Sequence, residues 1–217
     1  TAKDFGLAEG ATAHAEGTNA GDYYMHLTDE SFVNKNENFA SVTFIVEDGK
    51  LTITKRGAGE KKVELTAADN TVEYDGQAHG AKLNAAGEIE VGTSYTITNL
   101  AEGRRVKTVT IDGSETNAGV YEGKLVPSGA IIVDKEGNDV TANYEITYVA
   151  GDLTITKRGA GEMKVVLTAQ DNTVTYNGKV HGAKLNDAGE IEEGTSYTIT
   201  NLAEGHSVES VVIDAER

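Results

Sequence analysis

The sequence predicts a mainly β chain built as a tandem array of small β-rich modules of about 100 residues each, extended rather than globular. Three observations predict it. Apolar and polar residues alternate in several short runs. Threonine, valine, isoleucine and tyrosine dominate those runs, as pleated half-buried strands favour. Finally, Leu51–Asp112 aligns without a gap with Leu153–Asp214, at an offset of 102 residues, and 48 of the 62 positions are identical.

The offset divides the chain into a half, a whole and a half repeat. Thr18–Tyr23 corresponds to Thr116–Tyr121, so residues 1–54 match the second half of a repeat. Residues 55–156 form a complete repeat, and residues 157–217 match the first half of a further one. We therefore expect joints between modules near 54–59 and 156–161, where one strand runs into the next.

A half repeat leaves part of a core exposed and strand edges unpaired, which favours association. Residues 157–217 and residues 1–54 are complementary halves, so the first could be completed by the second from a neighbouring chain. Such head-to-tail contacts do not close and would give a filament. The alternative is that the ends fall at arbitrary points of a longer array.

The alternating runs are the predicted strands, each with one face on a core and the other in water. A short helical turn is expected over Asp139–Asn143, capped by Asp139. No long amphipathic helix is predicted, although the modules could be β-grasp-like with this turn. The predicted strands include Lys62–Thr66, Ser94–Thr98, Val106–Ile111 and Tyr144–Val149.

Glycine and proline mark the predicted turns between these strands. Asp48–Gly49 and Gly151–Asp152 each separate two strand-like runs, which predicts hairpin turns because glycine adopts positive φ readily. The single proline, Pro127, predicts a loop. The glycine-rich Arg56–Glu60 lacks the lysine and hydroxyl residue of a phosphate loop and indicates a flexible joint.

Composition excludes several classes of protein. The chain has no cysteine, so disulfides and thiolate metal sites are impossible. Its formal net charge of −16, from 35 acidic and 19 basic residues, argues against nucleic-acid binding, since a phosphate backbone would be repelled. No apolar run approaches the length of a membrane span, and no signal peptide opens the chain.

Four short motifs resemble the MBG/YDG-type repeat, and the similarity extends over essentially the whole chain, including Tyr176–Gly178 in the last piece. That repeat occurs in tandem in large bacterial surface proteins, many of them adhesins. The resemblance implies a non-enzymatic, extracellular role in cell adhesion and supplies no catalytic residues. The motifs are Val72–Gly76, Thr116–Tyr121, Asn143–Thr147 and Gly151–Thr156.

The polar residues offer two candidate chemistries, and each has a simpler structural interpretation beside it. Asp134, Glu136 and Asp139 lie around a glycine, as oxygen ligands do in calcium loops, but the spacing and the distant bidentate glutamate of such loops are missing, which favours a polar turn. A lysine–asparagine isopeptide bond, known from surface stalks, needs a desolvated lysine beside a carboxyl group. Its candidate residues are Lys62, Asn99, Lys164 and Asn201.

His79 and His181 occupy equivalent positions of the repeat, which is the best argument for a histidine site. No second histidine lies at metal-ligand spacing from either, so a turn residue is the simpler interpretation. Tyr23, Tyr24 and Tyr121 could form an aromatic platform for sugars, or pack across a sheet with their hydroxyl groups in water.

Two functions follow from this pattern. The first is a structural stalk or fibre module of a cell-wall-associated surface protein, which projects adhesive domains and contacts adjacent repeats or copies of itself. The second is a multivalent adhesin module whose repeats each bind a host or microbial glycan or protein weakly and gain avidity by repetition. An enzyme is not expected, and no cofactor is predicted apart from the calcium possibility.

Overall fold

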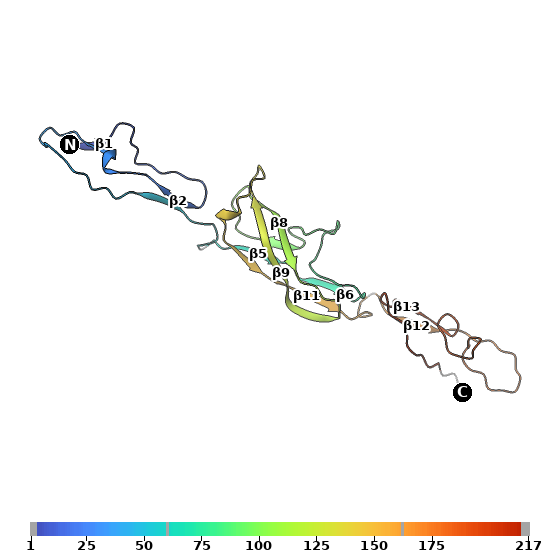
Figure 1. Cartoon of the computed structure of the whole chain (residues 1–217). Coiled ribbons are helices and arrows are strands. Elements are labelled where there is room, and N and C mark those ends of the chain that lie inside the picture. The colour runs from blue at the N-terminus through green and yellow to red at the C-terminus, as the bar shows by residue number, and fades with distance from the viewer. Residues whose placement is uncertain (1–3, 60, 162, 214–217) are drawn as a thin grey trace. The chain divides into compact units, whose positions relative to one another are not determined.

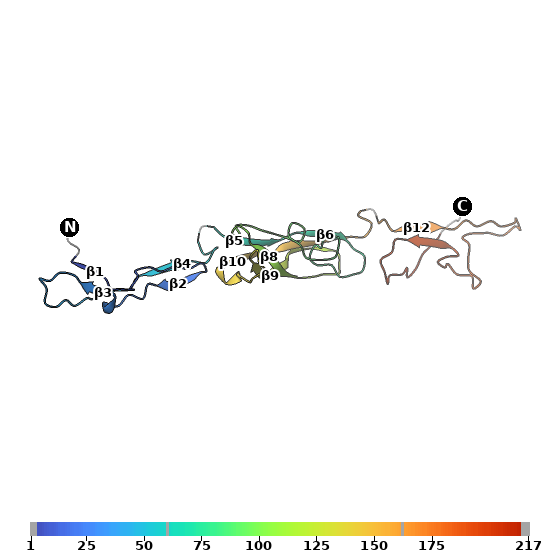
Figure 2. The same ribbon diagram turned by 90° about the horizontal axis from the view of Figure 1, so that it is seen from above.

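The computed structural model describes residues 4–59, 61–161 and 163–213, and this part of the chain is mainly β (Figures 1 and 2). It contains no α-helix; its helical turns are the 3-10 turns η1 (Asp29–Ser31) and η2 (Thr141–Asn143). No helix there is long and apolar enough to cross a membrane. The strands are β1 (Phe5–Leu7), β2 (Gly21–Tyr24), β3 (Phe32–Asn34), β4 (Lys50–Ile53), β5 (Val63–Ala67), β6 (Asn70–Glu73), β7 (Tyr95–Ile97), β8 (Arg105–Asp112), β9 (Gly119–Val133), β10 (Ile146–Val149), β11 (Gly151–Thr156), β12 (Val166–Ala169) and β13 (Tyr197–Thr200).

These strands form small sheets, of which the largest is mixed. Its order is β6-β11-β9-β8, with β11 parallel to β6 and antiparallel to β9. A second sheet has the order β10-β5-β7, and the pairs β1-β3, β2-β4 and β12-β13 stand as two-stranded sheets. We call residues 4–54 the head segment, 55–156 the middle segment and 157–213 the tail segment, following the sequence period.

Contacts divide the chain into two compact units, and the described residues of each contain a buried core. The first comprises Thr1–Leu65, Ile97–Val109 and Gly129–Thr147. Its buried cluster consists of Val63, Ile132 and Tyr144. The second comprises Thr66–Thr96, Thr110–Ser128 and Tyr148–Arg217, with a buried cluster of Ala67, Leu125, Leu153 and Ile155.

The predicted strands of the repeat are confirmed. β5, β7, β8 and β10 lie within two residues of the predicted bounds. In β5 the residues Val63, Leu65 and Ala67 are buried, as strict alternation requires of a strand with one face on a core.

Both hairpin predictions are wrong: residues 41–49 form no strand before β4, and the strands on either side of Gly151 join different sheets. Gly151 and Asp152 begin β11 rather than a turn; β10 pairs in the sheet of β5, and β11 pairs with β6 and β9. A Cβ on Gly151 would lie 2.7 Å from the main-chain oxygen of Ala67, so close backbone approach explains this glycine. Asp48 instead accepts hydrogen bonds from the main-chain N–H groups of His26 and Leu27.

The loop predicted at Pro127 is also wrong, since β9 runs through it. The pairing of β9 with β11 extends from Gly119 to Leu125 and ends before the proline. Proline has no N–H to donate, so it is tolerated in a strand where one neighbour is missing.

The helical turn is present, but its cap differs from the prediction. The turn η2 has Val140 at its N-cap position, without a side-chain cap. Asp139 lies one residue earlier, where its Oδ1 accepts a hydrogen bond from the N–H of Thr141 (2.8 Å). This is the short-range Asx turn that aspartate favours, so Asp139 leads into the turn without capping it.

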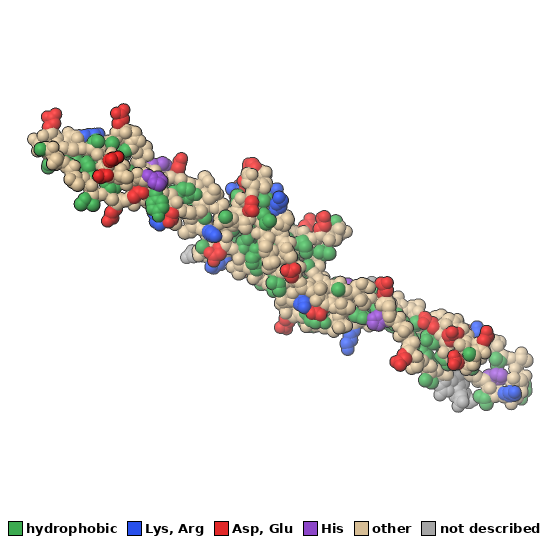
Figure 3. Space-filling view, in the orientation of Figure 1, with side chains coloured by type: hydrophobic (Ala, Val, Ile, Leu, Met, Phe, Trp, Pro, Cys, Tyr) green, Lys and Arg blue, Asp and Glu red, His purple; other side chains and the backbone are tan. Residues whose placement is uncertain are grey.

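Identical repeat positions differ in burial between the segments. Val63 and Leu65 are fully buried, whereas Val165 and Leu167 at the same repeat positions are 42% and 44% exposed. Figure 3 shows apolar side chains at the surface of both terminal segments; they include Phe5, Phe39, Ile45, Tyr176, Val180 and Val212. These faces lack the covering strands that the middle segment supplies to itself.

Candidate functional site at the joints between segments

Arg56 lies at the joint between the head and middle segments, and its side chain bonds main-chain oxygens of the middle segment. Its guanidinium group donates to the main-chain oxygen of Asn99 through Nε and lies 3.5 Å from that of Leu100 through Nη2. Asn99 has φ of 58°, a left-handed conformation that asparagine tolerates better than most residues. Its side chain donates to the main-chain oxygen of Lys62 (2.8 Å), which fixes the turn that presents the carbonyls.

The main chain of Arg56 is paired as well. Its N–H donates to the oxygen of Asn143 (2.9 Å), and the N–H of Glu145 donates to its oxygen (2.8 Å). The side chain of Asn143 also contacts the head segment. Its Oδ1 accepts from the N–H of Ala20 (2.6 Å), and its Nδ2 donates to Oδ1 of Asn19 (3.0 Å). One asparagine therefore bonds the end of β4 and the turn before β2 together.

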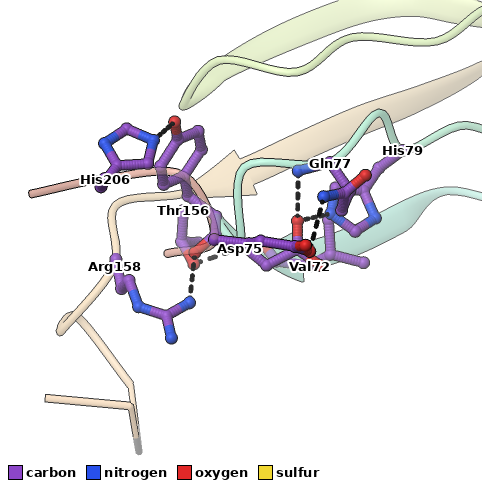
Figure 4. Close-up of polar contacts among 9 residues, drawn as sticks. Val72, Asp75, Gln77, His79, Thr156, Arg158 and His206 are labelled. Atoms are coloured by element: carbon purple, nitrogen blue, oxygen red, sulfur yellow. Dashed lines mark hydrogen bonds and ion pairs between the residues drawn. The ribbon is translucent and has the colours of Figure 1, made fainter. Parts of the chain in front are cut away.

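Arg158 repeats this arrangement 102 residues later, at the joint between the middle and tail segments. Its guanidinium group donates to the main-chain oxygens of Asn201 and of Leu202 (3.3 Å). It also donates through Nη1 to the oxygen of Tyr74 (3.1 Å), which belongs to the middle segment (Figure 4). A planar guanidinium with several donors suits such multiple carbonyl contacts.

Further side-chain contacts join the middle and tail segments around Arg158. The hydroxyl of Tyr74 is hydrogen-bonded to Nε2 of His206 (2.8 Å), and the two rings meet edge to face (Figure 4). Gln77 donates to Oε2 of Glu204 (3.2 Å). The N–H of Gly159 donates to Oε1 of Glu73 (2.7 Å). The joint is a hydrogen-bonded contact, so the glycine-rich stretch is more than the flexible linker that its composition indicated.

The acidic loop predicted as a calcium candidate forms a turn. Asp134 accepts from the N–H and Nδ2 of Asn138 (2.8 and 3.1 Å). The Asn138 side chain, followed by the main-chain N–H groups of the turn, lowers the pKa of Asp134. The pKa of Asp139 is lowered mainly by Thr141. In the described part of the chain, no group of three histidine or carboxylate side chains lies close enough together to hold a metal ion. This holds for Asp134, Glu136 and Asp139 as well.

In each candidate cross-link pair, the asparagine side chain bonds the main chain of its lysine and not the lysine amine. Asn99 and Asn201 each donate through Nδ2 to the main-chain oxygen of their lysine, Lys62 (2.8 Å) and Lys164 (2.9 Å) respectively. Both lysines are exposed. Isopeptide chemistry needs a desolvated lysine amine. The contact that each asparagine makes is instead a long-range hydrogen bond to a main-chain oxygen 37 residues away.

The two equivalent histidines make the same local contact. Nε2 of His79 lies 2.8 Å from Oδ1 of Asp75, and Nε2 of His181 lies 2.8 Å from Oδ1 of Asn177. The N–H of Gln77 is the main reason that the pKa of Asp75 is lowered, and His79 is the second (Figure 4). Each histidine thus closes a five-residue turn.

Acid is expected to weaken the turn at Asp75. Because the folded state lowers the pKa of this carboxyl, its contribution is present above the ordinary value of 3.8 and is lost as the pH falls through the folded value. The variant Asp75→Asn, which copies Asn177, should remove this part of the pH dependence. Urea unfolding at about pH 5 and about pH 2.5 checks it, and an equal loss in both proteins would contradict the assignment.

Sequence reasoning missed the residues that make the joints, namely Arg56, Arg158, Asn143 and Asn19. One signal was available for the arginines, because Lys-Arg follows Leu-Thr-Ile-Thr in both copies of the repeat. The asparagine pair gave none, since its members stand 124 residues apart.

Comparison of the chain with protein-family models, with curated proteins and with solved structures found no match.

Proposed function

We propose that the chain is a non-enzymatic structural segment of a bacterial surface protein, a stalk or fibre module that carries adhesive domains away from the cell. Its modules would be β-rich units of about 100 residues in an extended row. The supporting observation is that Arg56 and Arg158, at one repeat position, make the same pair of carbonyl contacts at successive joints. The resemblance to MBG/YDG-type repeats supports the extracellular location and adjacent repeats, or further copies of the chain, as partners.

The mechanical part of this proposal follows from how the joints are built. A joint tied by several hydrogen bonds limits bending between neighbouring modules, whereas a bare glycine linker behaves as a flexible coil. Arg158 contacts both the middle segment, through Tyr74, and the tail segment, through Asn201 and Leu202. Successive joints of this kind would link small domains into a long, stiff row of modules.

Small-angle X-ray scattering tests the proposal directly. A stiff row of modules is expected to give a radius of gyration well above the ~17 Å of a compact globule of this length. Cooperative unfolding must be shown in the same sample, because an unfolded chain is also large. A value near that of the globule would refute a stalk.

Removing the arginine at the second joint is expected to loosen it. The chain has no cysteine, so two can be placed at the exposed positions Glu122 and Glu193 for spin labels. Arg158→Ala removes three carbonyl contacts and should broaden the distance distribution between the labels. Arg56→Ala, at the other joint, is the matched control and should leave that distribution unchanged. Distance distributions of equal width for wild type and Arg158→Ala would refute the idea that Arg158 restricts motion at this joint.

A further inference from the structure

One surface, where the middle segment meets the tail segment, is the counterpart of the surface that Asn143 covers at the first joint. It comprises Asn117–Val120 and Thr154–Arg158, and a hollow lies over Ala118, Val120 and Ile155. Val120 is 68% exposed. At the equivalent surface of the first joint, Asn19 and Ala20 of the head segment and Arg56 of the middle segment are bonded to Asn143 and Glu145.

The polar groups of this surface repeat those of the covered one. Tyr121 donates its hydroxyl to the main-chain oxygen of Asn117, as Tyr23 does to that of Asn19, so both turns have the same shape. No described residue bonds the N–H of Ala118, the side chain of Asn117, or the main-chain N–H and oxygen of Arg158. These are the groups whose counterparts receive Asn143 and Glu145.

We infer that this surface binds the Asn-Tyr-Glu segment of a repeat's second half, in the way that Asn143–Glu145 binds the head segment. The asparagine would accept from the N–H of Ala118, donate to Oδ1 of Asn117 and accept from the N–H of Arg158, while the glutamate N–H pairs with the oxygen of Arg158. The inference deepens the proposed function, on which it rests, by naming the partner that completes the second joint.

The same geometry selects among second halves. Counting back from the shared Leu-Thr-Ile-Thr, the head segment carries Ser41–Thr43 at the positions of Asn143–Glu145. The amide of Asn143 accepts through Oδ1 and donates through Nδ2, two separate atoms, whereas serine has a single oxygen on a shorter side chain and cannot span both partners in this way. The surface therefore prefers a second half that carries Asn-Tyr-Glu, as the middle segment does. The head segment of another copy, which carries Ser41–Thr43 there, fits poorly.

Gly159 supplies a second requirement. Its counterpart Gly57 would place a Cβ 2.0 Å from the oxygen of Glu145, so the docked segment needs glycine there. At Gly159 the nearest atom to such a Cβ is 3.7 Å away. Beyond the strain of its positive φ, an alanine at Gly159 would therefore clash only with the docked partner.

The test is amide hydrogen exchange on the full chain and on a chain in which a copy of residues 113–156 follows Asp214. In the longer chain the amides of Ala118 and Arg158 are expected to exchange at least about tenfold more slowly. Asparagine→serine at the copied Asn143, or Gly159→Ala, should abolish that protection. The amides of Ala20 and Arg56 report in the same sample that the first joint is intact.

Unchanged exchange of Ala118 and Arg158 in the longer chain would overturn the docking. Protection that appears in the unextended chain as its concentration rises would overturn the selectivity, since Ser41 segments would then suffice. Neither result bears on the proposed stalk function, which the distances between spin labels at positions 122 and 193 test separately.

Discussion

Leu153→Ala is expected to lower the free energy of unfolding of the mixed sheet by about 2–5 kcal/mol. Leu153 is fully buried on β11 and packs in one cluster with Ala67, Leu125 and Ile155. Deleting its terminal carbons removes apolar burial and leaves a cavity between strands that are hydrogen-bonded to their neighbours and relax little. Urea unfolding followed through the amide signals of β9 and β11 measures the loss.

The repeat provides the control for this experiment. Leu51 is the same residue of the Leu-Thr-Ile-Thr motif on β4, and it is 38% exposed. Leu51→Ala should therefore cost clearly less, about 1 kcal/mol or under. If the two substitutions proved equally costly, the difference in burial between the segments would be wrong.

Gly57→Ala is expected to disrupt the first joint and to cost about 2–5 kcal/mol. Gly57 has φ of 104°, and a Cβ there would lie 2.0 Å from the oxygen of Glu145. Glu145 cannot retreat freely, since its N–H is bonded to the oxygen of Arg56 (2.8 Å). The amide of Glu145 should lose its protection from hydrogen exchange, which is the direct measurement.

Gly159→Ala is the matched control at the second joint. Gly159 also has positive φ, 85°, but among the described residues the nearest atom to the added Cβ is the main-chain nitrogen of Val165, at 3.7 Å. Only the dihedral strain of about 1–3 kcal/mol remains. Identical costs at the two glycines would mean that the contact with Glu145 does not hold the first joint.

Sequence periodicity found the strands whose pattern is local. β5, β7 and β8 alternate in the chain itself, and alternation alone places them. β9 was missed because Pro127 normally interrupts a strand, and its tolerance depends on where the pairing with β11 stops. The hairpin at Gly151 was wrong for a related reason, since β10 and β11 pair with strands far away in the sequence.

The joints lay beyond the reach of local patterns. Arg56 meets Asn99 across 43 residues, and Ala20 meets Asn143 across 123. Neither arginine nor asparagine differs in its neighbourhood from an ordinary surface residue, so no spacing rule selects them. The polar residues that did draw attention, Asp134, Asp139 and His79, prove to be bonded within their own turns.

The sequence by itself determined the period of 102 residues and the β character, because both depend on patterns that can be read along the chain. Only the tertiary structure decided which copy of a repeated residue is covered. Leu65 and Leu167 occupy one repeat position, yet one is fully buried and the other 44% exposed. Burial depends on the strands that lie over a residue, and those strands come from distant parts of the chain.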